Sequence, residues 1–313
     1  MKAKSLLDLQ EYFHNELVCA QYLEQMRWDG KPLCPHCGSE HHYRTTTRFK
    51  NPALKDYKDF LCKACGKKYT VITGTIYECS KVSLRTWLLA EYLIANHKKG
   101  ISSLQLARDL GVTQNTAWFI LHRIRASFKE DHEEKLTGIT QIDETFVGGK
   151  NKNRHYDKKV KYVGREPSRV DKTPVMGLLN YGKVRLFAVK DTSYDELRGV
   201  INRNIELRSI IISDDLYSYR TLGESYMHFI VRHSAKRYRS KEGFSTNGIE
   251  NVWSILKRGI IGIYHYVSRK HLQRYCDEFA YRFNTLSLTV VERFEDAIRR
   301  CGNARLTYKV LIS

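Results

Sequence analysis

Three acidic residues lie in or beside predicted secondary-structure elements, where their side chains could share metal ions. Asp143 stands in a strand-like apolar stretch, and Asp214 ends another. Glu250 opens a segment in which apolar residues recur at helical rather than alternating spacing. Carboxylates that converge from separate elements suit two divalent ions, each of which must touch a phosphate and either the attacking or the leaving oxygen. The pattern predicts phosphodiester chemistry.

The expected ions are Mg²⁺ or Mn²⁺, because hard carboxylate oxygens suit these cations and leave room for water and phosphate in an octahedral shell. We expect two ions. The ion shared by Asp143 and Asp214 would activate the nucleophile or stabilise the leaving oxygen, exchanging these roles between steps. Glu250 would complete the second site. The alternative is three solvated acids on an ordinary fold.

Two neighbouring acids compete for these roles. Side chains alternate along a strand, so Asp214 is in phase with the apolar run before it, whereas Asp215 is out of phase. We therefore expect Asp214 to be the ligand. By the same alternation, Glu144 is expected on the opposite face from Asp143.

Four cysteines form two pairs, each with a two-residue spacer and a following glycine. The spacer lets both sulfurs of a pair face one ion, and the glycine permits the tight turn around it. Two such pairs predict one structural zinc ion with four thiolate ligands; redox-active or merely buried thiols are the alternative. The predicted zinc ligands are Cys34, Cys37, Cys62 and Cys65. The isolated residues Cys19, Cys79, Cys276 and Cys301 are expected to be buried thiols.

A helical rhythm follows the cysteine region, from Leu84 to about Lys129, with interruptions at residues 98–100 and at Gly111. Three short helices are expected. Residues 101–125 are typical of a helix-turn-helix, because Gly111 can adopt a positive φ in the turn and Thr113 can cap the second helix. An ordinary packed helical pair gives much the same pattern.

In the helix-turn-helix interpretation, the start of the second helix faces DNA. Gln114 and Asn115 are expected to point toward bases, while Arg123 and Arg125 are expected to meet phosphates. Trp118 could equally well contact DNA or belong to the core.

The chain is strongly basic: lysine and arginine total 53 against 34 acidic residues, a net charge of +19 in 313 residues. Such a charge favours a polyanionic partner, most commonly a nucleic acid backbone, although a soluble basic protein is the alternative. Charges interrupt the first thirty residues, and no apolar run approaches the roughly 18 residues that span a bilayer. We therefore expect an intracellular protein.

The expected organisation is a mixed α/β chain of three parts. From Leu136 onward, strand-like and helix-like runs alternate in an order that suits the ribonuclease-H-like fold. A basic stretch at residues 150–161 is expected to be a loop, either solvated or against DNA. The three parts are an N-terminal helix with a zinc ribbon at 1–80, a helix-turn-helix at 81–135 and a ribonuclease-H-like catalytic domain at 136–313.

Seven parts of the sequence together form a recognisable set: the cysteine pairs and residues 73–76, 102–125, 141–150, 213–219, 247–258 and 264–284. This set resembles the DDE transposases of zinc-ribbon bacterial insertion sequences, relatives of the Merlin elements. The resemblance covers nearly the whole chain, and Ser245 departs from it where many relatives carry histidine. It implies that Asp143, Asp214 and Glu250 are the catalytic triad.

The resemblance implies a transposase that binds the terminal inverted repeats of its element, frees a 3′-hydroxyl and uses it to attack target DNA. Lys257 and Arg258 are expected to hold phosphate, and Asn247, one helical turn before Glu250, to support the metal site or bind DNA. Two ends must be joined, so at least a homodimer is expected on DNA, in the cytoplasm and with the nucleoid of a bacterium. A derived DNA-binding regulator and a nuclease without strand transfer are the alternatives.

Overall fold

The computed structural model describes residues 5–48, 57–149, 155–159, 172–231, 240, 243–303 and 305–312. The chain divides into two compact units, one of residues 1–128 with 287–313 and the other of residues 129–286. The cysteine region and the helical region, expected as separate domains, therefore share a unit. The end of the chain, expected in the catalytic domain, belongs to that unit too, because its helix α9 (Val290–Arg300) packs against α2 (Glu16–Trp28) and α3 (Leu84–Asn96).

The first unit begins with two helices and a small antiparallel sheet of strand order β1-β2-β3. Trp28, at the end of α2, meets Phe60 of β2 edge to face at 5.4 Å, and Phe60 stacks on Tyr69 of β3 at 5.1 Å. These aromatic rings form the core beside the paired cysteines. The elements are α1 (Leu6–Tyr12), α2 (Glu16–Trp28), β1 (His42–Arg48), β2 (Lys58–Cys62) and β3 (Lys68–Tyr69).

Three helices follow, as the helical rhythm predicted, and two more lie near the end of the chain. Gly111 ends α4 with a φ of 65°, and the Thr113 side chain accepts a hydrogen bond from the backbone N–H of Thr116, so both predicted turn residues are confirmed. The helices are α3 (Leu84–Asn96), α4 (Ser103–Leu110), α5 (Gln114–Ser127), α9 (Val290–Arg300) and α10 (Tyr308–Ile312).

The second unit contains a five-stranded sheet of order β6-β5-β4-β7-β8. Strands β4, β5 and β6 pair antiparallel, whereas β7 and β8 run parallel to β4. This is the mixed sheet of the ribonuclease-H-like fold, as expected. The strands are β4 (Ile139–Val147), β5 (Thr173–Asn180), β6 (Lys183–Ala188), β7 (Ile210–Ser213) and β8 (Met227–Ile230).

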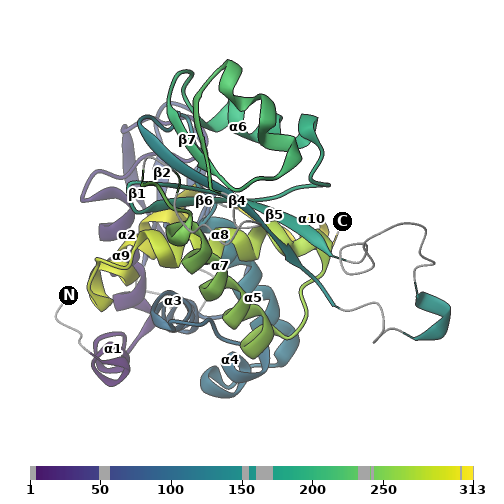
Figure 1. Cartoon of the computed structure of the whole chain (residues 1–313). Helices are drawn as coiled ribbons and strands as arrows, with labels where there is room; N and C mark the ends of the chain where they lie inside the picture. The colour runs from purple at the N-terminus through teal and green to yellow at the C-terminus, as the bar shows by residue number, and fades with distance from the viewer. Residues whose placement is uncertain are drawn as a thin grey trace. The chain divides into compact units, whose positions relative to one another are not determined.

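Helices cover both faces of this sheet (Figure 1). Side chains of β5 alternate between the two faces, so that Val175 and Leu179 pack toward α7 and α8, while Met176 and Leu178 pack toward α6. The helices are α6 (Tyr194–Asn204), α7 (Asn247–Gly259) and α8 (Leu272–Asn284). Across the described residues, no helix has the length and apolarity that crossing a membrane requires.

The cysteines outside the paired set lie in different surroundings. Cys19, Cys276 and Cys301 are buried, as expected, whereas Cys79 is exposed, and the prediction of a buried thiol is wrong there. Cys79 has a φ of 58° in the turn that precedes α3, and this turn directs its side chain to solvent. An isolated cysteine in a sequence carries no information about such a turn.

A buried polar cluster joins separate parts of the first unit. The Glu91 carboxylate is 0% exposed and accepts hydrogen bonds from the Tyr77 hydroxyl at 2.5 Å and the Cys301 thiol at 3.1 Å. Burial raises the pKa of Glu91 from 4.5 to about 7, although both hydrogen bonds oppose the shift. The carboxyl group therefore favours its protonated form inside the fold.

This shift predicts pH-dependent stability. Between pH 4.5 and about 7 the unfolded chain loses the Glu91 proton while the folded chain retains it, so the contribution of Glu91 to stability falls as pH rises through this window. Glu91→Gln, which keeps an acceptor for Tyr77, should raise the free energy of unfolding by about 3 kcal/mol at pH 8 and change it little at pH 4.5. Urea unfolding at the two pH values measures this. Glu11→Gln, at an exposed position, is the control, and an equal effect of Glu91→Gln at both pH values would contradict the prediction.

Candidate active site

Strands β4 and β7 bring two of the predicted acids together. The strands run parallel, and Gln141 lies opposite Ile212, so Asp143 and Asp214 follow at the same level two residues later. Asp143, Glu144 and Asp214 each place a carboxylate oxygen within 4.8 Å of the others. Asp214 belongs to this cluster, and the exposed Asp215 does not.

Glu144 belongs to the cluster although strand alternation directs it away from Asp143. Its carboxylate accepts a hydrogen bond of 2.8 Å from the hydroxyl of Tyr219, a residue of the 3₁₀ helix Tyr217–Glu224. Pairing of β4 with β7 ends at Gln141 and Ile212, so β7 does not pair with β4 at Asp143 and Glu144, where the other edge of β4 remains paired with β5. Strand alternation places Glu144 on the opposite face, so the sequence pattern alone did not indicate that Glu144 belongs to the site.

Helix α7 brings Glu250 to the same place, because its first turn is fixed to β4. The side-chain oxygen of Gln141 accepts a hydrogen bond of 3.0 Å from the backbone N–H of Ile249. Gly248 permits this approach: a Cβ there would lie 2.7 Å from the Gln141 oxygen. The Glu250 carboxylate itself accepts a hydrogen bond of 3.0 Å from the Thr246 hydroxyl.

Trp253, one helical turn after Glu250, holds the central carboxylate. Its indole N–H donates a hydrogen bond of 2.8 Å to Asp143. Gly177 lies opposite Asp143 on β5, and a Cβ at that position would come within 2.6 Å of the indole ring. This role of Trp253 was not among the predictions from the sequence. Its position three residues after Glu250, on the same side of the helix, was the available signal.

A cavity of about 450 Å³ surrounds these groups. All three predicted catalytic acids line it, although Glu250 is not part of the tight cluster that the described acids form. The residues that line the cavity are Asp143, Glu144, Thr145, Asp214, Thr246, Glu250, Trp253, Ser254 and Lys257.

The crowded acids affect one another electrostatically. Burial raises the pKa of Asp143 from 3.8 to about 6, and the negative charges of Asp214 and Glu250 add to this shift. The N–H groups of Trp253 and Glu144 oppose it by stabilising the charged form. A divalent cation would offset both the burial and the repulsion, and the carboxylate oxygens are the ligands that Mg²⁺ and Mn²⁺ prefer. The residues present therefore fit such an ion.

The paired cysteines fit a zinc ion. The sulfur atoms of Cys34 and Cys65 are 3.7 Å apart, and those of Cys37 and Cys62 are 3.6 Å apart. All four sulfur atoms lie within 4.8 Å of one another. Tetrahedral zinc with Zn–S bonds of about 2.3 Å requires S–S distances of about 3.8 Å. Hydrogen bonds from the backbone N–H groups of Cys65 and Ala64 lower the pKa of Cys62 to about 6, which favours the thiolate. Four cysteines complete the coordination, so the site is suited to structure rather than catalysis.

The residues expected to contact DNA from α5 fall into two groups. Gln114 and Asn115 are exposed at its start, whereas Arg123 and Arg125 are only 3% and 1% exposed. These two arginines were expected to contact phosphates, but both side chains are buried inside the unit. Arg123 donates a hydrogen bond of 2.7 Å to the carbonyl oxygen of Glu78 and lies over aromatic rings. The second half of α5 packs inside the unit, and Trp118, half-buried, lies against His122 at 4.3 Å.

The residues expected to contact DNA from α7 are all exposed. Lys257 lines the cavity, and Asn247 begins the helix at the level of the acids. Arg258 lies beside Lys257 and donates a hydrogen bond to the Ser254 carbonyl oxygen. Most of the basic stretch at 150–161 lies outside the described residues.

The fold and its acids define a ribonuclease-H-like domain of the DDE type, and two family models agree with this class. Residues 135–284 match the ISXO2-like transposase domain, and residues 14–68 match the transposase zinc-ribbon domain. The chain belongs to the family of DDE transposases that combine these two domains.

Individual proteins show weaker similarity. The chain is 29% identical over 175 residues to an uncharacterized protein in transposable element ISH50 of Halobacterium salinarum, a match over 54% of this chain and 56% of the relative. The chain thus spans about half the length of this relative. Among solved structures, the Mos1 strand transfer complex has a TM-score of 0.28 at 14% identity, covering 66% of this chain and 74% of that one.

A simian T-cell lymphotropic virus intasome, in complex with a PP2A regulatory subunit, also has a TM-score of 0.28 at 14% identity. The match covers 56% of this chain and 63% of that one. The family assignment rests on the two domain matches and on the geometry of the site.

Loss of the zinc ligands should unfold the ribbon. Cys34→Ser is expected to reduce bound zinc from about one equivalent to nearly none and to lower the melting temperature of the first unit, because metal binding and folding are coupled in such modules. Elemental analysis and calorimetry of the full chain measure both. Cys79→Ser, at an exposed thiol outside the cluster, should change neither. Purified protein with less than about half an equivalent of zinc, together with normal folding of Cys34→Ser, would contradict the assignment.

Trp253→Phe should separate the hydrogen bond to Asp143 from the packing of the ring. Phenylalanine keeps most of the buried surface but cannot donate, and a hydrogen bond to a charged group contributes about 1.5–3 kcal/mol. We expect about ten-fold or greater loss of DNA cleavage, a higher Mg²⁺ requirement and a nearly unchanged melting temperature. Cleavage at a series of Mg²⁺ concentrations measures this. Normal cleavage with normal Mg²⁺ dependence would show that the bond does not position Asp143.

Proposed function

We propose that the protein is a transposase that binds the terminal inverted repeats of an insertion sequence and catalyses metal-dependent DNA cleavage and strand transfer. The observation that carries this proposal is the convergence of Asp143, Asp214 and Glu250 on one cavity within a DDE transposase domain. The three acids come from two strands and a helix, so the site depends on the whole fold of the second unit.

Two consecutive reactions use this cavity. In the first, water attacks the phosphodiester at the transposon end, which frees a 3′-hydroxyl on one side and leaves a 5′-phosphate on the other. In the second, that 3′-hydroxyl attacks a phosphodiester of target DNA and displaces the target's own 3′-hydroxyl. Asp143, Asp214 and Glu250 would hold two divalent cations, Mg²⁺ or Mn²⁺, which would stabilise the attacking and leaving oxygens. Lys257 is exposed at the cavity and holds the phosphate by its charge, with Arg258 beside it.

The first unit supplies recognition of the transposon ends. Gln114 and Asn115 are exposed at the start of α5, directly after the turn at Gly111, which is where a recognition helix contacts base edges. The zinc ribbon, built on Cys34, Cys37, Cys62 and Cys65, adds a second DNA-binding module. Two transposon ends are processed together, so the active form on DNA is at least a homodimer, in the bacterial cytoplasm with the nucleoid.

The test is a supercoiled-plasmid assay with Mg²⁺ and the element's own ends, located as inverted repeats that flank the gene. Wild-type protein should give strand-transfer products. Asp143→Asn, Asp214→Asn and Glu250→Gln should each lose more than about 100-fold of the cleavage rate while retaining DNA binding, because each variant removes a ligand charge. The matched control is Asp215→Asn, at the exposed neighbour outside the cluster, and it should cleave normally.

The other outcomes distinguish the rival functions. Cleavage without transfer would indicate a nuclease, and binding without cleavage would indicate a regulator. Normal cleavage by Asp214→Asn with an inactive Asp215→Asn would move the metal ligand to the next residue.

A further inference from the structure

The segment that continues from the active site is basic and free of acids. Residues 251–276, here called the basic segment, contain no aspartate or glutamate. The segment begins within α7, one residue after Glu250, and Lys257 lines the catalytic cavity. Its lysines and arginines are Lys257, Arg258, Arg269, Lys270 and Arg274. The side chains that this segment itself offers to a polyanion leaving the cavity are therefore positive or neutral.

One exposed stripe of α7 runs from the acids toward the end of this helix. Glu250, Ser254, Lys257 and Ile261 are all exposed. At about 100° per residue, Glu250, Ser254 and Lys257 lie within about 60° of one another around α7, and Ile261 follows in the next turn of the chain. At a rise of about 1.5 Å per residue, Ile261 lies about 16 Å from Glu250 along the helix, which is about five nucleotides of a stacked strand. Ile261 is 70% exposed, which is unusual for isoleucine.

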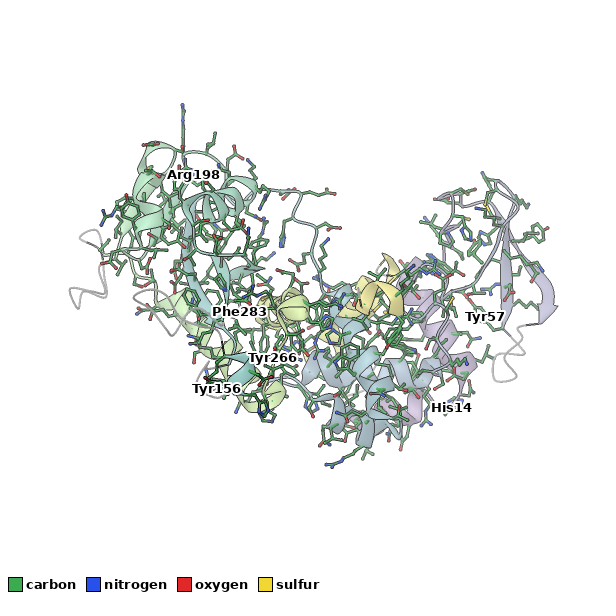
Figure 2. All side chains as sticks on the ribbon, turned by 90° about the vertical axis from the view of Figure 1, so that its right-hand side faces the viewer. His14, Tyr57, Tyr156, Arg198, Tyr266 and Phe283 are labelled. Carbon is green, nitrogen blue, oxygen red and sulfur yellow. The ribbon has the colours of Figure 1, made fainter. Side chains whose placement is uncertain are left out.

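The chain then makes an irregular turn that exposes an aromatic ring. Helix α7 passes into a π-helix, Ile260–Tyr264, and His265 follows with a φ of 57°, a conformation that non-glycine residues rarely adopt. Tyr266 is 70% exposed, whereas its neighbour Val267 is buried. The position of Tyr266 can be followed in Figure 2.

Buried contacts on the inner side hold this turn in place. The Tyr264 hydroxyl donates a hydrogen bond of 2.6 Å to Glu278, and its ring meets Tyr275 edge to face at 4.8 Å. Glu278 is 0% exposed and also pairs with Arg282 at 2.5 Å. Such a backbone outlier persists only where the surrounding structure fixes it, and it often marks a functional position. Here the fixed turn presents Tyr266 to solvent.

We propose that Ile261 and Tyr266 form a nucleobase-binding site for the single-stranded DNA that adjoins the cleaved phosphodiester, with Tyr266 stacking on a base. Cations that follow a backbone, combined with an exposed aromatic ring, are the features that bind single strands. Duplex DNA would satisfy the cations but would leave the ring without a partner, because its base faces are stacked. The inference rests on the proposed function and adds a contact some distance from the reacting phosphate.

Binding to forked DNA tests this site in the full chain. The probe is an oligonucleotide duplex with a single-stranded arm, compared by fluorescence anisotropy with a blunt duplex of the same length. Tyr266→Ala should weaken binding to the forked probe by about ten-fold, the size of one lost base stack, with little effect on the blunt duplex. Tyr266→Phe keeps the ring and should bind like wild type. Tyr194→Ala, on α6 across the sheet, is the control for loss of an exposed tyrosine.

A photochemical measurement locates the contact directly. With 5-iodouracil at successive positions of the arm, crosslinking to Tyr266 should be concentrated at one or two positions of the arm. If wild-type protein prefers the forked probe, Tyr266→Ala keeps that preference and no crosslink forms at Tyr266, this inference is overturned. The proposed function would still stand. Failure of wild-type protein to bind any of these probes would overturn both. If Tyr266→Ala loses the same affinity for the forked probe and for the blunt duplex, Tyr266 stabilises the fold or contacts duplex DNA, and the inference is overturned.

Discussion

The contact between the first two turns of α7 and strand β4 is the constraint on which the catalytic unit depends. Gln141 and Asp143 lie on the same face of β4, and they receive hydrogen bonds from the Ile249 backbone and the Trp253 indole. Gly177 leaves room for the indole ring. The same contact therefore orients the carboxylate of Asp143 and places Glu250 at the cavity. A helix shifted by one residue would lose both bonds and carry Glu250 away from the two aspartates.

The sheet brings together the other two acids of the site. Parallel pairing of β4 and β7 puts Asp143 and Asp214 at one level, where side chains from adjacent strands approach each other. Both faces of the sheet are covered by helices, so the acids are partly removed from water. Burial and mutual repulsion together raise the pKa of Asp143, and a divalent cation offsets both effects. The fold thus makes the charged carboxylates unfavourable on their own, and a bound metal ion would stabilise their charge.

Periodicity in the sequence predicted the five strands of the catalytic sheet and helices α3 to α8, and it favours Asp214 over Asp215 as the ligand, because these depend on local alternation and spacing. It could not predict the burial of Arg123 and Arg125, since a helical period does not say which distant segments cover each side of α5. The C-terminal residues 287–313 belong to that unit, far away in the sequence. The membership of Glu144 depends on where β7 ends, and the bond from Trp253 to Asp143 depends on a small residue in a third strand. These are tertiary facts, which local patterns do not contain.

The central claim is that Asp143, Asp214 and Glu250 hold catalytic divalent cations. The most direct measurement is anomalous diffraction from crystals of the full chain bound to transposon-end DNA and Mn²⁺. One anomalous peak is expected between the carboxylates of Asp143 and Asp214, and a second beside Glu250, with the scissile phosphate between the two. Peaks absent from this cavity, or a peak coordinated by Asp215 in place of Asp214, would contradict the account.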